Sequence, residues 1–113
     1  MINFSSLFSF SQKEIKQAFN KAKFKNKING LKLLQLSSEE LDEKPSLGKI
    51  LIVIPGKTGN AIKRNKIRRQ IKAIFYEEKL FEKPLISILL VYKPALKLNF
   101  EQVKEFLVKS FES

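Results

Sequence analysis

The chain has 113 residues, of which 43% are apolar and 11% are aromatic, a composition typical of a folded domain and not of a disordered chain. This length fits one domain over residues 1–113, with residues 1–10 as an irregular lead-in. Cysteine and histidine are absent, which excludes disulfides, Cys/His zinc sites and catalysis that needs a histidine base. The sequence has neither a long apolar run nor a basic, signal-like N-terminus, so a cytoplasmic location is expected.

The net charge of +11 is concentrated in two stretches of the chain. Residues 57–72 hold seven Lys or Arg and no acidic residue, and residues 13–32 hold seven Lys and one Glu. Together these stretches exceed the charge of the whole chain, so the remainder is slightly acidic. Such a local excess indicates a polyanionic partner, which by charge alone is either nucleic acid or an anionic membrane.

The first predicted element is a helix that begins after Ser11 and ends at about Lys23. Ser11 and Glu14 have the spacing of a capping box, in which each side chain bonds to the other residue's backbone N–H. Helical spacing also predicts one apolar face, formed by Ile15, Ala18, Phe19 and Ala22.

Two strands are predicted after this helix. The turn signal Asn29-Gly30 precedes an apolar run over residues 31–36, and a run rich in β-branched residues spans residues 49–54. The acidic stretch between them, residues 37–46, is expected to be a solvated loop.

A second helix is predicted from an N-cap at Asn60 to about Lys79. Its apolar face is expected to consist of Ile67, Ile71, Ile74 and Phe75. The far side of this helix carries Asn65, Arg68, Arg69 and Lys72. A strand over residues 85–92 and a helix over residues 99–111, capped by Asn99, complete the chain.

The predicted order of elements is therefore α-β-β-α-β-α. Apolar strands flanked by amphipathic helices favour an α/β (α+β) two-layer sandwich. Its small central sheet would have about three to four strands and would be accompanied by three helices.

The strongest candidate site is the basic second helix together with the residues that lead into it. The first-turn N–H groups of a helix bind anions such as phosphate, and Lys and Arg side chains add positive charge. Mutual repulsion within such a run costs stability unless a polyanion relieves it, so nucleic-acid binding is favoured over a solvated face. The candidate residues are Lys57, Asn60, Lys63, Arg64, Asn65, Lys66, Arg68, Arg69 and Lys72.

Two aromatic residues, Phe19 and Phe24, lie among the lysines of the first basic stretch. Aromatic faces beside cations hold single-stranded bases by stacking. The alternative is that Phe19 belongs to the core, which its place on the apolar face of the helix also allows. The carboxylates form no convincing catalytic pair, so catalysis would have to come from a partner.

Residues 57–69, KTGNAIKRNKIRR, resemble the arginine-rich signature of the bacterial ribonuclease P protein family. That signature is a Lys, then Gly-Asn-Ala-apolar, then Arg-Asn-basic-Ile-basic-Arg. The resemblance extends over about residues 7–111 and includes the closing strand, Lys-Pro and helix. Three features depart from the family pattern. The chain lacks Lys and Arg before Ser11, it has Pro55-Gly56-Lys57 where the family usually has Ser-Lys-Lys, and it has Ile15 where the family commonly has an aromatic residue.

The resemblance implies a left-handed β-α-β crossover, although such connections are generally right-handed. It also implies the protein subunit of an endoribonuclease that removes the 5′ leader of precursor tRNA, with the active site and the catalytic Mg²⁺ ions in an RNA subunit. The protein would hold no cofactor and have no activity alone. Its partners would be the RNA subunit, bound through the second helix, and precursor tRNA, with no membrane and no obligate protein partner.

The leader would lie between the first helix and the sheet. The residues that the resemblance places there are Lys13, Lys16, Phe19, Lys23, Phe24 and Leu33.

Two other functions are compatible with the same charge. The first is a non-catalytic structural RNA-binding protein, for example of the ribosome. The second is a protein that binds anionic membranes, which predicts large apolar residues bordering the basic face of an exposed helix. Here the apolar face opposite the basic residues is expected to face a core, which favours RNA.

Overall fold

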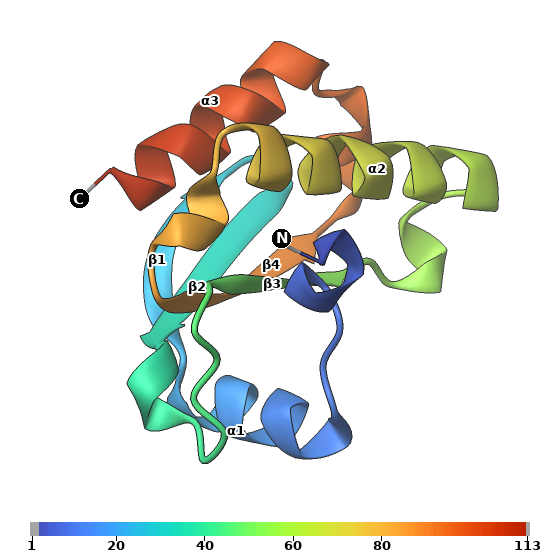
Figure 1. The fold of residues 1–113 in the computed structure, drawn as a ribbon. Helices are drawn as coiled ribbons and strands as arrows, with labels where there is room; N and C mark the ends of the chain where they lie inside the picture. The colour runs from blue at the N-terminus through green and yellow to red at the C-terminus, as the bar shows by residue number, and fades with distance from the viewer. Residues whose placement is uncertain (1–2, 113) are drawn as a thin grey trace.

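A four-stranded mixed sheet forms the centre of the computed structural model, which describes residues 3–112 (Figure 1). The strands, in sequence order, are β1 (Lys23–Ile28), β2 (Leu31–Ser37), β3 (Lys49–Val53) and β4 (Leu85–Val91). Their order in the sheet is β1-β2-β4-β3, with β2 antiparallel to both of its neighbours and β3 parallel to β4. The helices are α1 (Gln12–Lys21), α2 (Ala61–Glu77) and α3 (Phe100–Phe111).

The predicted helix starts are confirmed by their hydrogen bonds. The backbone N–H of Glu14 donates to the Ser11 hydroxyl over 3.1 Å, and the Ser11 N–H donates to the Glu14 carboxylate over 2.9 Å. Asn60 and Asn99 cap α2 and α3 through their side-chain carbonyl oxygens. Each cap satisfies a first-turn N–H that has no partner within the helix, which fixes where the helix begins.

Strand β1 was not predicted from the sequence, and the first helix was predicted to end at about Lys23. Helix α1 instead ends at Lys21, and the chain becomes extended. Strand β1 is mostly polar and pairs only with β2, so it carries no strong apolar pattern. The turn after it requires glycine at position 30, because Gly30 has φ of +98° and the backbone of Ala95 leaves no room for a Cβ.

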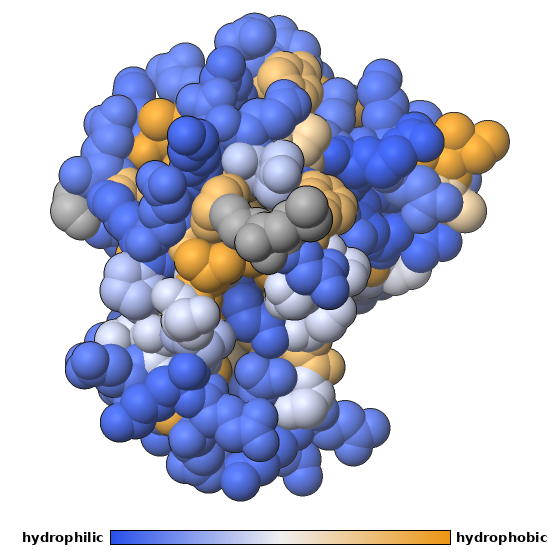
Figure 2. All heavy atoms as spheres, viewed as in Figure 1, coloured by the Kyte–Doolittle hydropathy of each residue, from blue (hydrophilic) through white to orange (hydrophobic). Residues whose placement is uncertain are grey.

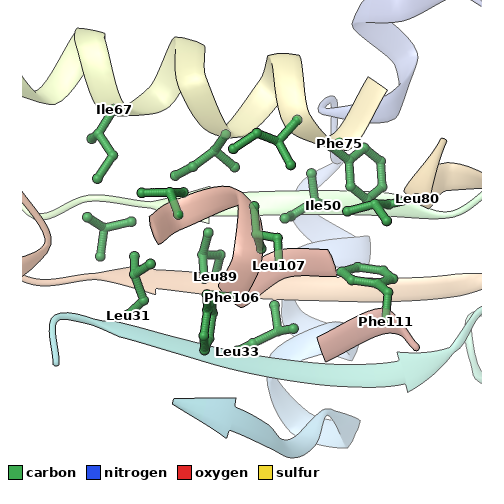
Figure 3. Packing of buried hydrophobic residues seen from close by; sticks show 14 of the residues in the cluster. Leu31, Leu33, Ile50, Ile67, Phe75, Leu80, Leu89, Phe106, Leu107 and Phe111 are labelled. Atoms are coloured by element: carbon green, nitrogen blue, oxygen red, sulfur yellow. The ribbon is translucent and has the colours of Figure 1, made fainter. Parts of the chain in front are cut away.

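The larger core lies between the sheet and the two helices α2 and α3 (Figure 3). Helix α2 buries the four residues predicted for its apolar face. Helix α3 covers the same face of the sheet with its own apolar residues. The fully buried residues of this core include Leu31, Leu33, Ile50, Ile71, Ile74, Phe75, Leu89 and Leu107.

A smaller core lies on the opposite face of the sheet, beneath α1. Ala18 is fully buried there against Leu36, Leu41, Ile86 and Ile88. Helix α1 is thus a third layer, added to the two expected from the sequence, and Figure 1 shows it on the side of the sheet away from α2 and α3, next to the short 3-10 helix Ser38–Glu40.

The N-terminal segment is ordered against the body of the protein and is not the irregular lead-in that was expected. Phe4–Leu7 form a 3-10 helix, and the side chain of Leu7 is buried in the larger core. The Phe8 ring lies 5.8 Å from that of Phe75, and the Phe4 ring lies 5.2 Å from that of Tyr76. These aromatic contacts fix the segment beside α2, in front of β3 in Figure 1.

The connection from β3 through α2 to β4 joins two parallel neighbouring strands. In Figure 1, β3 lies nearer the viewer than β4, both run from left to right, and α2 passes above them. Seen from α2 along the strands, β4 therefore lies to the left of β3, which is the left-handed crossover. Within residues 3–112, no helix is long and apolar enough to cross a membrane.

Candidate nucleic-acid interface

The start of α2 is held by two polar side chains that the sequence placed in the candidate site. The side-chain oxygen of Asn60 accepts a hydrogen bond from the Lys63 backbone N–H over 2.9 Å. The half-buried Arg64 donates from Nε to the carbonyl oxygen of Gly59 over 3.0 Å. Both residues therefore shape the loop and the helix start, in addition to any contact that they make with an anion.

The outward side of α2 is positively charged along most of its length, with the exposed Ile62 among the cations of the first turn. Lys63, Lys66 and Arg69 are exposed, and Lys57 is exposed in the short 3-10 helix Gly56–Thr58 that precedes α2. No acidic side chain interrupts α2 before Glu77. We call this the α2 surface and define it as Lys57, Lys63, Arg64, Lys66, Arg68, Arg69 and Lys72.

The two flanks of α2 border small recesses. On the β3 flank, Arg68 and Lys72 are half-buried and line a recess of about 170 Å³ together with Phe8. There Arg68 donates to the Asn65 side-chain oxygen over 2.8 Å, and Lys72 Nζ lies 5.3 Å from the centre of the Phe8 ring. On the other flank, Lys63 and Lys66 line a recess of about 150 Å³. The cations thus border recesses on both flanks of the helix, whereas the sequence analysis assigned a side only to Asn65, Arg68, Arg69 and Lys72.

Helix α1 and the two aromatic residues of the second basic stretch lie on the opposite face of the sheet. Phe19 is 45% exposed and Phe24 is 59% exposed, so neither ring belongs to a core. The alternative that Phe19 is a core residue is therefore wrong, although Ala18 beside it is fully buried. Both rings are available to a ligand.

Helix α1 is held to the sheet along one flank. Lys49 Nζ lies 3.3 Å from the Glu14 carboxylate, and the Gln17 side-chain oxygen accepts from the Asp42 N–H over 3.2 Å. At 100° per residue, Ile15 and Phe19 lie on the other flank of the helix. They therefore point along the sheet, toward the part that α1 does not cover.

The uncovered part of the sheet is apolar with a basic border. We call it the open face and define it as Phe24, Lys32, Leu34, Leu51, Val53 and Leu90. Its leucines and Val53 are only half-buried, and Lys32 Nζ lies 6.0 Å from the centre of the Phe24 ring. In Figure 2 the molecule is hollowed on its right side, between the α1 layer and the larger layer that carries α2.

The prediction for Leu33 is wrong. Its side chain is fully buried in the larger core, on the side of α2 and α3. Strand residues alternate between faces, so the next residue, Leu34, lies on the open face instead. The run LKLLQL over residues 31–36 has adjacent leucines at positions 33 and 34, so the sequence alone contained no signal for which of the two lies on the open face.

The lysines predicted to contact the leader divide between different surroundings. Lys13 Nζ lies 3.0 Å from the Asp42 carboxylate, on the flank of α1 away from Phe19. Lys23 is the register partner of Gln35, and Gln35 lies on the same face of the sheet as Leu33. The side chain of Lys23 therefore leaves the backbone on the face that carries the larger core, opposite the open face. Lys16 is exposed and lies one turn before Phe19, on the same side of α1.

Two carboxylates near α1 have lowered pKa values. Partial burial raises the pKa of Glu14, but hydrogen bonds from the Ser11 N–H and from Lys49 outweigh that effect and lower it overall. A hydrogen bond from Lys13, followed by one from Gln17, lowers the pKa of Asp42. Both groups are therefore negatively charged at neutral pH and offset lysines at this end of α1.

The α2 surface and the open face therefore point in opposite directions, with the sheet between them. The α2 surface lies on one side, and the open face with Phe19 lies on the other. One stretch of RNA backbone cannot lie against both surfaces without passing around an edge of the sheet. The arrangement suits simultaneous contact with two different RNA segments.

Comparisons with known proteins identify a family for the chain. The family model described as Ribonuclease P matches residues 10–113. The chain is 42% identical over 55 residues to the ribonuclease P protein component of Bacillus velezensis, a match that covers 49% of this chain and 47% of the relative. It is 36% identical over 67 residues to that of Dictyoglomus turgidum, which covers 57% and 56% of the two chains. The chain thus spans about half the length of the curated relatives it matches.

The fold is also found among solved structures. The RNase P protein of Staphylococcus aureus is similar, with a TM-score of 0.75 and 20% identity over 94% of this chain and 93% of that one.

Proposed function

The chain belongs to the Ribonuclease P family, and we propose that it is the protein subunit of a ribonucleoprotein endoribonuclease that removes the 5′ leader from precursor tRNA. The observation that carries the proposal is the α2 surface, in which residues 57–69 form the short 3-10 helix, the Asn60 cap and the first turns of α2, with seven cations on the whole surface and no acidic residue among residues 57–69. In this proposal the α2 surface binds the catalytic RNA subunit, and the open face binds the leader. Cleavage takes place in the cytoplasm, where precursor tRNA is present.

The protein's own contribution is electrostatic. Two polyanions, the RNA subunit and the precursor, repel each other unless positive charge lies between them. A basic protein with cationic surfaces on both sides of its sheet supplies that charge. The RNA subunit supplies the active site and the Mg²⁺ ions, while this chain, lacking histidine and cysteine, binds and positions RNA.

The test is reconstitution with a bacterial ribonuclease P RNA and a precursor tRNA, with and without the protein, over a series of Mg²⁺ concentrations. We expect the protein to lower the Mg²⁺ needed for cleavage and to tighten the binding of precursor relative to mature tRNA. The protein alone should leave the precursor intact. Cleavage that is unaffected by the protein at every Mg²⁺ concentration would contradict the proposal.

A structural RNA-binding protein is the second candidate, favoured by the α2 surface, because a dense row of cations on one helix is enough for contact with an RNA backbone and needs no leader site. It predicts tight binding to the RNA subunit with no preference for leader-bearing tRNA. A membrane-binding role predicts binding to anionic vesicles that competes with RNA, and the same preparations test it.

A further inference from the structure

A recess of about 460 Å³ lies at the end of the sheet farthest from α1, where β2 begins and β4 ends. Its lining combines an aromatic ring, two cations and a side-chain amide. The residues that line it are Lys27, Ile28, Asn29, Gly30, Leu31, Lys32 and Tyr92. Tyr92 and Lys27 are not among the residues that define the α2 surface or the open face.

Tyr92 continues the open face beyond the last residue of β4. Its backbone is extended, and its N–H donates to the carbonyl oxygen of Gly30 over 2.8 Å, so the strand geometry persists at this position. Leu90 lies on the open face and Val91 is buried in the larger core, so alternation returns Tyr92 to the open face. The side chain is 46% exposed, which leaves part of the ring accessible to a ligand.

The two lysines of the recess lie on the same face as Tyr92. Lys32 is the register partner of Leu90, and Lys27 is the register partner of Lys32. No acidic side chain lines this recess. A neighbouring recess of about 440 Å³ beside α3 differs, because there Lys109 lies 3.0 Å from Glu105, which offsets its charge.

We infer that Tyr92, Lys27 and Lys32 form a nucleotide-binding site for single-stranded RNA, in which a base stacks on the Tyr92 ring and the lysines contact the adjacent phosphates. The inference rests on the proposed function and extends the leader path away from α1. Phe24 lies across the sheet from Ile88, because both are register partners of Leu34. Tyr92 follows Ile88 by four residues, which in a strand is a distance of about 13 Å. Tyr92 is therefore a stacking surface separate from Phe24.

The first experiment uses the tyrosines as reporters, because the chain has two tyrosines and no tryptophan. In a Tyr76→Phe protein, Tyr92 is the one fluorescent tyrosine, and in a Tyr92→Phe protein it is Tyr76. Each protein is titrated with a short single-stranded oligoribonucleotide, and binding is measured separately by anisotropy of a labelled copy. We expect the fluorescence of Tyr92 to be quenched in proportion to the RNA bound. The fluorescence of Tyr76 should fall only as much as light absorption by the RNA accounts for.

The second experiment uses the reconstituted holoenzyme and precursors whose leaders increase in length one nucleotide at a time. With the unaltered protein, affinity should rise in steps as the leader grows. Tyr92→Ala should remove the step contributed by the more distant nucleotides, about tenfold in affinity, and keep the steps nearest the cleavage site. Tyr92→Phe should retain this step.

The lysines are tested by the salt dependence of leader binding. Lys27→Ala and Lys32→Ala should each reduce the log–log slope by about 0.7, while the loop variant Lys44→Ala should leave the slope unchanged.

The outcomes separate this inference from the proposed function. RNA binding without quenching of Tyr92, or a full set of leader steps in Tyr92→Ala, would overturn the inference and leave the proposed function in place. A lack of any leader-dependent affinity with the unaltered protein would instead contradict the role in leader binding on which the inference rests. Circular dichroism of each variant excludes misfolding as the cause of a lost step.

Discussion

Arg64 donates a hydrogen bond from Nε to the carbonyl oxygen of Gly59, and this 3.0 Å contact joins the first turn of α2 to the loop before it. The side chain is half-buried, whereas Arg69, a little more than one turn later, is exposed. Two arginines of one basic helix therefore have different tasks. Arg64 holds the helix start in addition to carrying charge, and Arg69 carries charge alone.

The first prediction compares Arg64→Ala with Arg69→Ala. Arg69→Ala should weaken binding to the RNA subunit and change the free energy of unfolding by about 0.5 kcal/mol or less. Arg64→Ala should weaken binding and also cost about 1 kcal/mol of stability, because the Gly59 carbonyl loses its partner. Urea denaturation and RNA titration of both variants test this.

Ile71→Ala is a control for the loss of a core side chain and should cost about 2–5 kcal/mol of stability. Equal stability losses in the two arginine variants would contradict the assignment.

The second prediction concerns ionic strength. If the α2 surface neutralises roughly six phosphates, the logarithm of the RNA-binding constant should fall with the logarithm of salt concentration with a slope of about −4 to −5. Because the chain has no histidine, no histidine changes its charge near neutral pH and alters this slope. A slope near zero would contradict electrostatic binding.

The third prediction uses two adjacent leucines of β2. Leu33→Ala removes a fully buried side chain and should cost about 2–5 kcal/mol of stability. Leu34→Ala removes a half-buried side chain of the open face, so it should cost less stability and reduce the preference for precursor over mature tRNA. Thermal denaturation and paired tRNA titrations measure both effects. If Leu33→Ala folded normally and selectively lost the leader preference, the two faces of β2 would be assigned the wrong way round.

The fourth prediction concerns the ion pair between Glu14 and Lys49. The pKa of Glu14 is lower in the folded protein than in the unfolded chain, so its contribution is present above the unfolded value and is lost as pH falls through the folded value. Glu14→Gln should therefore reduce stability by about 1 kcal/mol at neutral pH. That difference should disappear in acid. Denaturation of both proteins from neutral pH to below pH 4 tests this, with the exposed loop variant Glu43→Gln as control.

Much of the fold was predictable because its signals are local. Each predicted cap has its side chain within three residues of the N–H that it satisfies, so Ser11, Asn60 and Asn99 could be assigned from spacing alone. The apolar face of α2 has regular helical spacing and was predicted correctly. These elements depend on neighbours in sequence, and sequence contains that information.

The errors arose where structure depends on distant partners. Strand β1 is polar and is stabilised by pairing with β2, so its own residues did not identify it. The phase of β2, which separates Leu33 from Leu34, is set by helices far along the chain. The exposure of Phe19 depends on which end of the sheet α1 covers. The N-terminal segment is fixed by rings of α2, such as Phe75 and Tyr76, that lie more than 60 residues away.

The last prediction concerns Phe19, which is 45% exposed at the border of the open face. In a leader-binding role, its ring stacks on a base, and losing one stacked base costs about 1–3 kcal/mol of binding free energy. Phe19→Ala in the reconstituted holoenzyme should therefore weaken precursor binding by that amount and leave mature tRNA unaffected. Because the ring is outside both cores, the variant should fold, and circular dichroism with urea denaturation checks this.

The matched control for Phe19→Ala is Tyr76→Ala, which removes an equally exposed ring on the other side of the sheet. Tyr76 stacks on Phe81, with ring centroids 5.9 Å apart, so this control should lose some stability and keep the full preference for precursor. The leader enters only precursor binding, so a loss confined to precursor in Phe19→Ala identifies a contact with the leader and not a general weakening of RNA affinity. If a folded Phe19→Ala protein keeps the whole preference, the leader does not reach α1, and the open face binds it without this ring.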